Sequence, residues 1–400
     1  MEGYQILNTL LLMIILIWRR IPIGYVMLGC SAMLALMYRT HIIDFFMMLW
    51  RGVTNPVTME LVIILIFIMV FEALLRKEGY LENMLTGLQA VIPNPRIVMA
   101  LLPIFIGVMP SAGGALFSAP LVEHAAKDLS ATPEQKSFVN FYYRHVTEYF
   151  LPIYPSVLLI ASMANLHVRQ LILALIPFGA LAVLLGIPEL KKIAIVKKED
   201  HERTEKKQVT KELLLSALPI LIVVFLVLVV ATKVWIGVGS VLLYLFIYHR
   251  YTPNKIWNLL RDAFKFKTIF LVFAVMIFKQ VLEDTGAVAA LPQLLSQLPV
   301  PSYFVFIVIN FIVGVMTGHM IAIVGIGFPL ALAVLGASFD VQTAVLLFIA
   351  GFAGQMITPT HLCLTLTVNF FKADLSKVIR MLIGREAALL AAAIAVYMII

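Results

Sequence analysis

Long apolar runs separated by short polar segments make up most of the chain. Runs of about 17–25 residues with few charges are typical of helices that cross a bilayer. The first run is not a secretory signal, because no basic segment precedes it and Arg19 and Arg20 follow it. The pattern predicts an all-α integral membrane protein. Spanning helices are expected at about 4–18, 22–38, 58–76, 170–187, 213–231, 233–248, 267–283 and 381–400.

Four shorter pieces are not expected to span the membrane. Those at 42–53 and 253–264 are amphipathic. Those at 80–92 and 287–298 are too short and too polar to cross, so they are expected to lie along the surface.

Two apolar stretches, 96–127 and 302–335, are interrupted near their middles. The first contains Pro110-Ser111-Ala112-Gly113-Gly114, and the second contains Thr317-Gly318-His319. Glycine and proline interrupt regular helix. We interpret each stretch as a re-entrant hairpin whose tip lies inside the bilayer.

Two helices, 133–166 and 341–370, are also interrupted. The first begins at a capping box formed by Thr132 and Gln135, with a proline at the first helical position. It is broken at Pro152 and Pro155, and the second helix is broken at Thr358-Pro359. Each segment after a break spans about 16 Å, half of a ~30 Å hydrocarbon core, so both breaks are expected near the midplane.

The order of spans, hairpin and broken helix occurs twice, which predicts an internal repeat. With a shift of 207 positions, residues 61–109 align on 268–316 without a gap, and the two prolines after the breaks align with a shift of 204. Five crossings in each half would invert the second half. The matching positions include Gly79/Gly286, Gly107/Gly314, Val108/Val315, Met109/Met316 and Pro155/Pro359.

The predicted division is an N-terminal repeat at 1–187, a linker at 188–212 and a C-terminal inverted repeat at 213–400. The first repeat comprises scaffold helices 1–76, surface arm 80–92, hairpin 96–127, broken helix 133–166 and helix 170–187. The second comprises scaffold 213–283, surface arm 287–298, hairpin 302–335, broken helix 341–370 and helix 381–400.

The composition agrees with a membrane protein, since 62% of residues are hydrophobic and 13% are charged. The net charge of +8 does not indicate nucleic acid, because the basic residues lie in short loops between apolar runs. With the N-terminus outside, 24 of the 30 Lys and Arg fall on the inner side, including the linker, which is expected to be solvated. The two cysteines lie in apolar stretches and predict neither a disulfide framework nor a metal cluster.

Breaks at membrane depth indicate a binding site, because an unpaired backbone group in hydrocarbon costs several kcal/mol. Half-helix N-termini carry partial positive charge and suit an anion, whereas carbonyls at the C-termini suit Na⁺. The alternative is that glycine and proline only kink helices or let them pack. Hydroxyl ligands are expected from Ser111, Ser118, Ser156, Thr317, Thr358 and Thr360.

Ionisable residues within the spans are candidates for ion coupling. Arg144 and Glu148 are four residues apart and share a helix face, either as a structural pair or with Glu148 binding Na⁺ or H⁺ and Arg144 tuning it or meeting an anion. His319 and His361 lie beside predicted breaks, and either is a candidate for carrying a proton near neutral pH. The alternative is that they only form hydrogen bonds between helices. The spacing of His145 and Glu148 has no matching second set, so no metal is expected beyond Na⁺.

Two segments, GVMPSAGGALFSAPLVEHAA and YYRHVTEYFLPIYPSVLLIASMA, resemble the prokaryotic membrane family numbered 401 among domains of unknown function. The wider arrangement of hairpin and broken helix is similar to the ion-transporter superfamily of citrate, gluconate, C4-dicarboxylate, lactate and arsenite carriers. The resemblance implies an elevator-type carrier in the plasma membrane, commonly a homodimer, with the two surface pieces as arms.

By position, the resemblance gives the hairpin tips and the broken-helix ends the role of binding substrate. The Ser-Asn-Thr tips of the dicarboxylate carriers are absent here, which leaves the cargo open. The positions that take these roles are Ser111, Ala112, Gly113, Gly114, Thr317, Gly318 and His319 at the tips, and Tyr154, Pro155, Ser156, Thr358, Pro359, Thr360 and His361 at the breaks.

The sequence therefore predicts a secondary transporter that moves a small anion, an organic carboxylate by first choice, coupled to Na⁺ or H⁺. No nucleotide-binding motif is present, and no other cofactor is expected. A cation/proton antiporter, an anion channel and an intramembrane enzyme with Ser111 as nucleophile and His319 as base remain alternatives.

Overall fold

The computed structural model describes residues 3–19, 21–108, 115–196, 206–287 and 299–399. The expected hairpin tip at Ser111–Gly114 and nearly all of the expected arm at 287–298 lie outside these residues. Within them, the regular structure is helical apart from one antiparallel pairing, of β1 (Leu129–Ser130) with β2 (Ala194–Ile195).

The helices fall into two sets of similar order. The first set comprises α1 (Gly3–Trp18), α2 (Ile23–Met37), α3 (Ile42–Thr54), α4 (Pro56–Lys77), α5 (Tyr80–Val91), α6 (Pro95–Gly107), α7 (Ala115–Ala125), α8 (Pro133–His145), the 3₁₀ turn η1 (Val146–Tyr149), α9 (Pro155–Met163) and α10 (Val168–Lys192). The second set comprises α11 (Lys206–Leu228), α12 (Val234–Tyr248), α13 (Pro253–Ala263), α14 (Phe266–Asp284), α16 (Ser302–Thr317), α17 (Met320–Leu335), the 3₁₀ turn η3 (Gly336–Ser338), α18 (Val341–Met356), α19 (Leu362–Phe371) and α20 (Leu375–Ile399).

Every span expected from the sequence coincides with a helix. Within the described residues, α4, α10, α11 and α20 are long and apolar enough to cross a membrane. Several helices of 10–17 residues, such as α2, α12 and α16, are apolar but shorter. Together with the interrupted helices, they build an all-helical membrane protein.

The two sets match in detail. Helices α10 and α20 each contain 25 residues, and both ends of α20 lie 207 positions after those of α10. Positive backbone φ angles recur with the same shift, at Gly79 (75°) and Gly286 (71°), and at Asn165 and Lys372 (both 53°). A positive φ marks a specific local turn, so the same turns occur at equivalent points in both sets.

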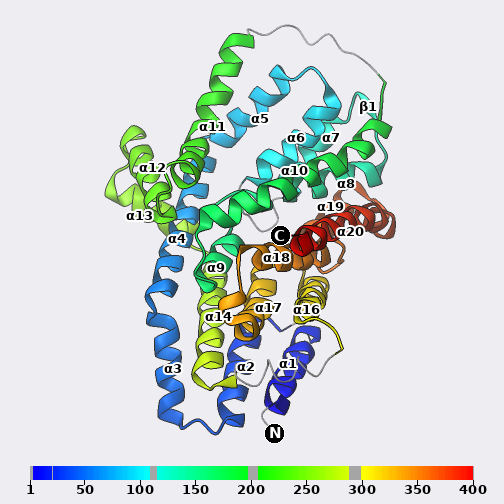
Figure 1. Cartoon of the computed structure of the whole chain (residues 1–400). Coiled ribbons are helices and arrows are strands. Elements are labelled where there is room, and N and C mark those ends of the chain that lie inside the picture. Colours follow the sequence, from blue (N-terminus) through cyan, green and yellow to red (C-terminus); the bar gives the residue numbers. More distant parts are fainter. Residues whose placement is uncertain (1–2, 20, 109–114, 197–205, 288–298, 400) are drawn as a thin grey trace.

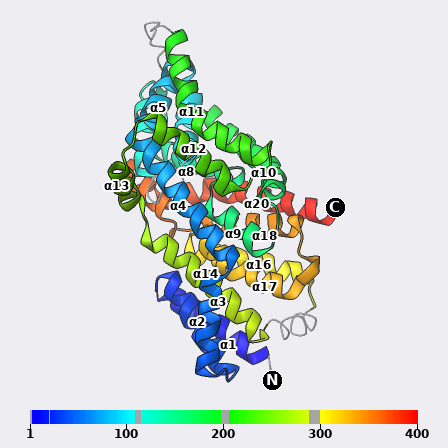
Figure 2. The same ribbon diagram turned by 90° about the vertical axis from the view of Figure 1, so that its left-hand side faces the viewer.

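The interrupted helices lie in the middle of the molecule. Figure 1 shows α9, α16, α17 and α18 between the end formed by α1–α3 and the end formed by α5–α7. Helices α10, α18 and α20 pack against one another, and both views place them side by side (Figures 1 and 2). The end of α8, which carries Arg144, is packed against α6 and α19.

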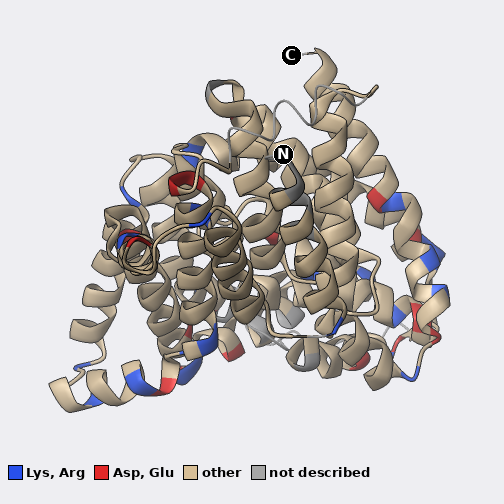
Figure 3. Cartoon of the chain, turned by 90° about the horizontal axis from the view of Figure 1, so that it is seen from below, with Lys and Arg blue, Asp and Glu red and all other residues tan. Residues whose placement is uncertain are grey.

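Charged residues lie mainly at helix ends and in connections, and the helices between are largely without them (Figure 3). Arg76 and Lys265, both expected on the inner side, share the carboxylate of Glu72 at 3.1 and 3.0 Å. Lys192 and Arg385, also expected there, share Glu189 at 2.9 and 3.3 Å. These pairs are compatible with the expected topology.

The polar linker is shorter than the expected 188–212. Helix α10 continues to Lys192, β2 follows it, and α11 begins at Lys206. The reason is that Glu189 is buried, with hydrogen bonds from Gln135 and Arg385, so this part of the segment is packed rather than solvated. Charge content alone does not separate solvated charges from paired ones.

Candidate functional site

The first broken helix carries polar residues that are buried at its break. The predicted capping box is present, since Gln135 N–H donates to Thr132 Oγ1 at 3.2 Å and Thr132 N–H donates to Gln135 Oε1 at 3.1 Å. Helix α8 ends at His145 and continues as the 3₁₀ turn η1, and the chain is then non-helical until Pro155 begins α9. The change to 3₁₀ geometry brings residues three apart together. His145 Nε2 lies 3.8 Å from Glu148 Oε1.

The second break meets the second hairpin. Thr358 and Thr360 both donate their hydroxyls to the carbonyl of Val315, near the end of α16, at 2.6 and 3.2 Å. Gly318 adopts φ 61° at the hairpin tip, and a Cβ there would lie 2.7 Å from the backbone nitrogen of His361. Because Gly318 has no side chain, the hairpin tip contacts the break directly.

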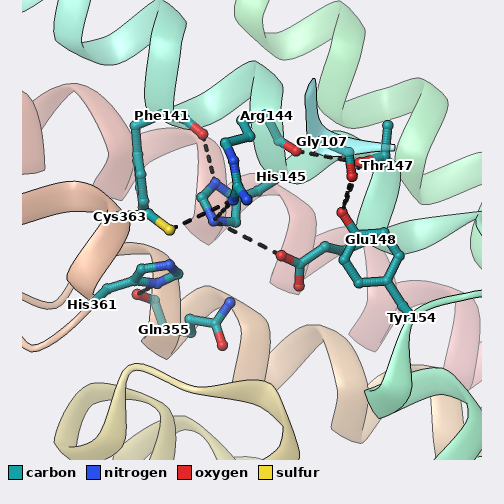
Figure 4. A network of polar contacts seen from close by, with 10 residues as sticks. All are labelled: Gly107, Phe141, Arg144, His145, Thr147, Glu148, Tyr154, Gln355, His361 and Cys363. Atoms are coloured by element: carbon teal, nitrogen blue, oxygen red, sulfur yellow. Dashed lines mark hydrogen bonds and ion pairs between the residues drawn. The ribbon is translucent and has the colours of Figure 1, made fainter. Parts of the chain in front are cut away.

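Four side chains from the two breaks converge at the centre (Figure 4). Arg144 Nη1 lies 3.5 Å from Cys363 Sγ, to which it donates, and 3.5 Å from His145 Nε2. The rings of His145 and His361 meet edge to face, with centroids 4.8 Å apart. All four residues are buried. A guanidinium, two imidazoles and a thiol, drawn from both sets of helices, thus share one small volume.

Glu148 lies on the side of this cluster away from Cys363 (Figure 4). Its carboxylate interacts electrostatically with Arg144 and reaches the side-chain amide of Gln355. Gln355 stands 207 positions after Glu148 and is its neutral counterpart in the second set. The charge of the site is therefore asymmetric, although the helices that carry it are arranged alike.

Tyr154 joins the first break to α6. Its hydroxyl donates to the carbonyl of Gly107, and it lies 3.0 Å from the hydroxyl of Thr147. A Cβ at Gly107 would overlap the carbonyl oxygen of Arg144. The last residue of α6 and the end of α8 are consequently in backbone contact.

A second polar contact, beside the central cluster, links the first set of helices to the second. Asn140 Nδ2 donates to Thr367 Oγ1 on α19 at 3.0 Å and to the carbonyl of Ala115 on α7 at 3.1 Å. Ser118 donates to the same Ala115 carbonyl at 3.3 Å and is buried. Ser118 thus lies at the contact between α7 and α8.

The structure brings together many of the residues expected from the sequence. Arg144, Glu148, Tyr154 and His361 belong to the central network, and Thr358, Thr360 and Gly318 lie at the adjoining contact between hairpin and break. Thr317 hydrogen-bonds within α16 and to the backbone N–H of His319, and His319, Pro359 and Thr360 are exposed. Pro155 and Ser156 form the first turn of α9. Ser111, Ala112, Gly113 and Gly114 are outside the described residues.

Three residues of this region were not expected from the sequence. Cys363 stands in an apolar run, and Gln355 carries no signal until its alignment with Glu148 is considered. Glu386, in α20, is 2% exposed, and neither of its carboxyl oxygens has a hydrogen-bond partner among the described residues. Glu386 lies inside the expected span 381–400, and an ionisable residue in such a span is itself a signal of function. That signal could have identified Glu386.

Comparison with known proteins supports this architecture. Residues 4–400 match the model of a family described as "Protein of unknown function (DUF401)". The fold is similar to the crystal structure of the Alcanivorax borkumensis YdaH transporter, described as having an unusual topology, with a TM-score of 0.60 and 14% identity over 88% of this chain and 87% of that chain. None of the curated proteins matches the chain.

Proposed function

The chain belongs to the DUF401 family, and from this premise and its central site we propose that it is a secondary transporter for a small anion. Transport of an organic carboxylate, driven by Na⁺ or H⁺, is the form we favour. The observation that carries the proposal is the convergence of two interrupted helices and a hairpin on the buried Arg144. Interrupted backbone at membrane depth is typical of transporter sites.

Reciprocal packing supports an inverted repeat. Helices of the first set have their equivalents ten labels later in the second set. Helix α2 packs on α14, and its equivalent α12 packs on α4. In the same way, α7 packs on α19 and α17 on α9, and α8 packs on α20 and α18 on α10. Contacts that exchange partners in this way are those of a two-fold axis. The odd number of crossings that the sequence predicts in each half would put that axis in the membrane plane.

The same symmetry holds at single glycines. A Cβ at Gly107 would overlap the carbonyl of Arg144, and a Cβ at Gly314 would overlap that of Gly351. Both members of the second pair lie 207 positions after those of the first. The hairpins therefore dock on the broken helices in equivalent ways, which supports alternating access by rearrangement of two similar halves. Movement as an elevator and dimerisation remain parts of the proposal that only the family resemblance supports.

The chemistry favours an anion. Arg144 supplies a permanent positive charge, and the backbone N–H groups at the starts of α9 and α19 add partial positive charge. Glu148 is the group proposed to carry the coupling proton or to bind Na⁺, since it lies beside Arg144 and His145. His319, Pro359 and Thr360 are exposed at the neighbouring contact between hairpin and break.

The proposal is tested with purified protein and a set of small carboxylates and inorganic oxyanions. A true substrate binds the folded state and raises the melting temperature, by an amount that grows with ligand concentration. Arg144→Gln is expected to abolish this increase. Lys136→Gln is the control and is expected to retain it, because Lys136 pairs with the exposed Glu123 away from the site. An unchanged response in Arg144→Gln would contradict the assignment.

Cation/proton antiport is the second candidate, because the buried Glu148 lies beside His145, whose ring meets that of His361. It predicts that a Na⁺ or K⁺ gradient moves protons in liposomes without any added anion. The anion transporter predicts no such movement until substrate is present.

A further inference from the structure

The centre of the site contains three ligand atoms of the kinds that bind transition metals. One ring nitrogen each of His145 and His361 and the Sγ of Cys363 all lie within 4.8 Å of one another. The three residues are buried, at 1%, 6% and 7% exposed. They come from α8 and from the start of α19, which are 216 residues apart in the chain, so no sequence spacing reveals them.

Hydrogen bonds hold both histidines with one nitrogen directed away from the cluster. His145 Nδ1 lies 2.6 Å from the carbonyl of Phe141, and His361 Nδ1 lies 3.2 Å from the carbonyl of Gln355. A carbonyl only accepts, so each Nδ1 carries the proton and each Nε2 keeps its lone pair. Histidines that bind metals in proteins are oriented by this kind of hydrogen bond.

A carboxylate lies beside His145, on the side away from Cys363 (Figure 4). Glu148 Oε1 is 3.8 Å from His145 Nε2. His145, His361 and Cys363 offer two imidazoles and one thiolate, and the nearby Glu148 carboxylate adds a second negative charge that helps to neutralise a dication. Tetrahedral zinc sites use such ligands at about 2.0–2.3 Å from the metal, so the side chains would have to close by roughly 1 Å.

We propose that His145, His361 and Cys363 bind one divalent transition-metal ion of the Zn²⁺ class. This inference goes beyond anion transport, which needs no such ion. Binding releases the thiol proton of Cys363 to solvent and leaves both imidazoles neutral. Hard ions such as Na⁺ prefer oxygen ligands, so the sulfur and nitrogen ligands select for a softer metal.

Arg144 competes with the metal for the same lone pairs. Its Nη1 lies 3.5 Å from both Cys363 Sγ and His145 Nε2, so the guanidinium must move aside when the metal enters. Arg144→Gln is therefore expected to bind metal more tightly than the parent protein, by at least tenfold. The same change is expected to abolish anion binding. Because this one variant should strengthen metal binding and remove anion binding, the metal-site proposal and the anion-transport proposal are tested separately.

The test uses the purified full chain in detergent and Co²⁺ as a spectroscopic substitute for Zn²⁺. A thiolate-to-cobalt absorption band is expected at one ion per chain, and added Zn²⁺ should remove it. Cys363→Ser should lose the band. Cys30→Ser should keep it, because Cys30 is also buried but lies elsewhere, near the carbonyl of Thr9. His361→Asn should weaken binding at least tenfold.

The Cys30→Ser protein keeps the test informative even if Cys363→Ser does not fold. In that background, bound Zn²⁺ should also protect Cys363 from alkylation. The absence of the band from the parent protein at millimolar Co²⁺, or an unchanged band in folded Cys363→Ser, would overturn the proposal.

Discussion

At the scale of single residues, the site combines groups that oppose one another in charge. Arg144 and Glu148 are both buried, and each lowers the cost of burying the other. Their partners are the neutral His145, Cys363 and Gln355. A carrier needs this balance, because the site must be stable both with and without its charged cargo.

Glu148→Gln is expected to separate binding from coupling. It removes the group proposed to carry the driving ion but leaves Arg144, so anion binding should persist or tighten. Uptake driven by a Na⁺ or proton gradient should fall at least tenfold, measured as initial rates in liposomes. Glu123→Gln, on an exposed carboxylate that pairs with Lys136 at 2.8 Å, is the control and should keep the parent rate. Gradient-driven uptake at the parent rate in Glu148→Gln would remove Glu148 from coupling.

Glu386 offers a prediction about stability. Because neither carboxyl oxygen has a hydrogen-bond partner among the described residues, replacing the side chain by methionine should stabilise the fold by about 1–3 kcal/mol. The matched change Glu189→Met should destabilise it, since Glu189 accepts hydrogen bonds from Lys192 and Arg385. Melting temperatures measured in one detergent would show both effects, and a loss of stability in Glu386→Met would reveal a partner for this carboxyl group.

At the scale of elements, turns and close approaches recur in both sets of helices. Gly79 precedes α5 with φ 75°, and Gly286 has φ 71° at the equivalent position. The junction at Gly79 is also held by neighbouring side chains. Tyr251 donates to Glu78 at 2.6 Å, and His249 contacts both Glu78 and Tyr80. Burial, together with the hydrogen bond to Glu78, raises the pKa of Tyr251, so the phenol keeps the proton that it donates into the alkaline range.

Alanine substitution should distinguish these glycines from ordinary helical ones. At Gly79 and Gly286 no described atom lies within 4 Å of the position that a Cβ would take, but the positive φ disfavours any other residue by about 1–2 kcal/mol. Gly384, in the middle of α20, has the same open space and helical backbone, so alanine there should stabilise by about 1 kcal/mol. Equal effects at the three positions, measured by thermal unfolding, would contradict the backbone argument.

Gly107→Ala and Gly314→Ala should disturb function more than those changes. Each Cβ would overlap a backbone carbonyl, of Arg144 or of Gly351, and would push a hairpin off its broken helix. A cost of about 1–3 kcal/mol is expected for such overpacking, with loss of transport. If one variant transported normally and the other not at all, the two hairpins would not be equivalent.

At the scale of the whole molecule, the sequence predicted the architecture better than the chemistry. Apolar runs located the helices, and Pro155 and Thr358-Pro359 located the breaks, because these signals act locally. The sequence shows the spacing of His145 and Glu148 but does not mark the 3₁₀ turn that follows His145. The approach of Cys363 to His145 depends on tertiary packing across the two halves, which no local pattern encodes.

The central claim is that Arg144 and Glu148 form one anion site between two similar halves and use an ion gradient to move the anion. Solid-supported membrane electrophysiology on reconstituted protein tests it directly, with small carboxylates and oxyanions added under Na⁺ or pH gradients. We expect an anion-evoked current that requires one of the two ions and is absent from Arg144→Gln. A current carried by cations alone, or an anion current that neither gradient nor Arg144→Gln alters, would contradict the claim.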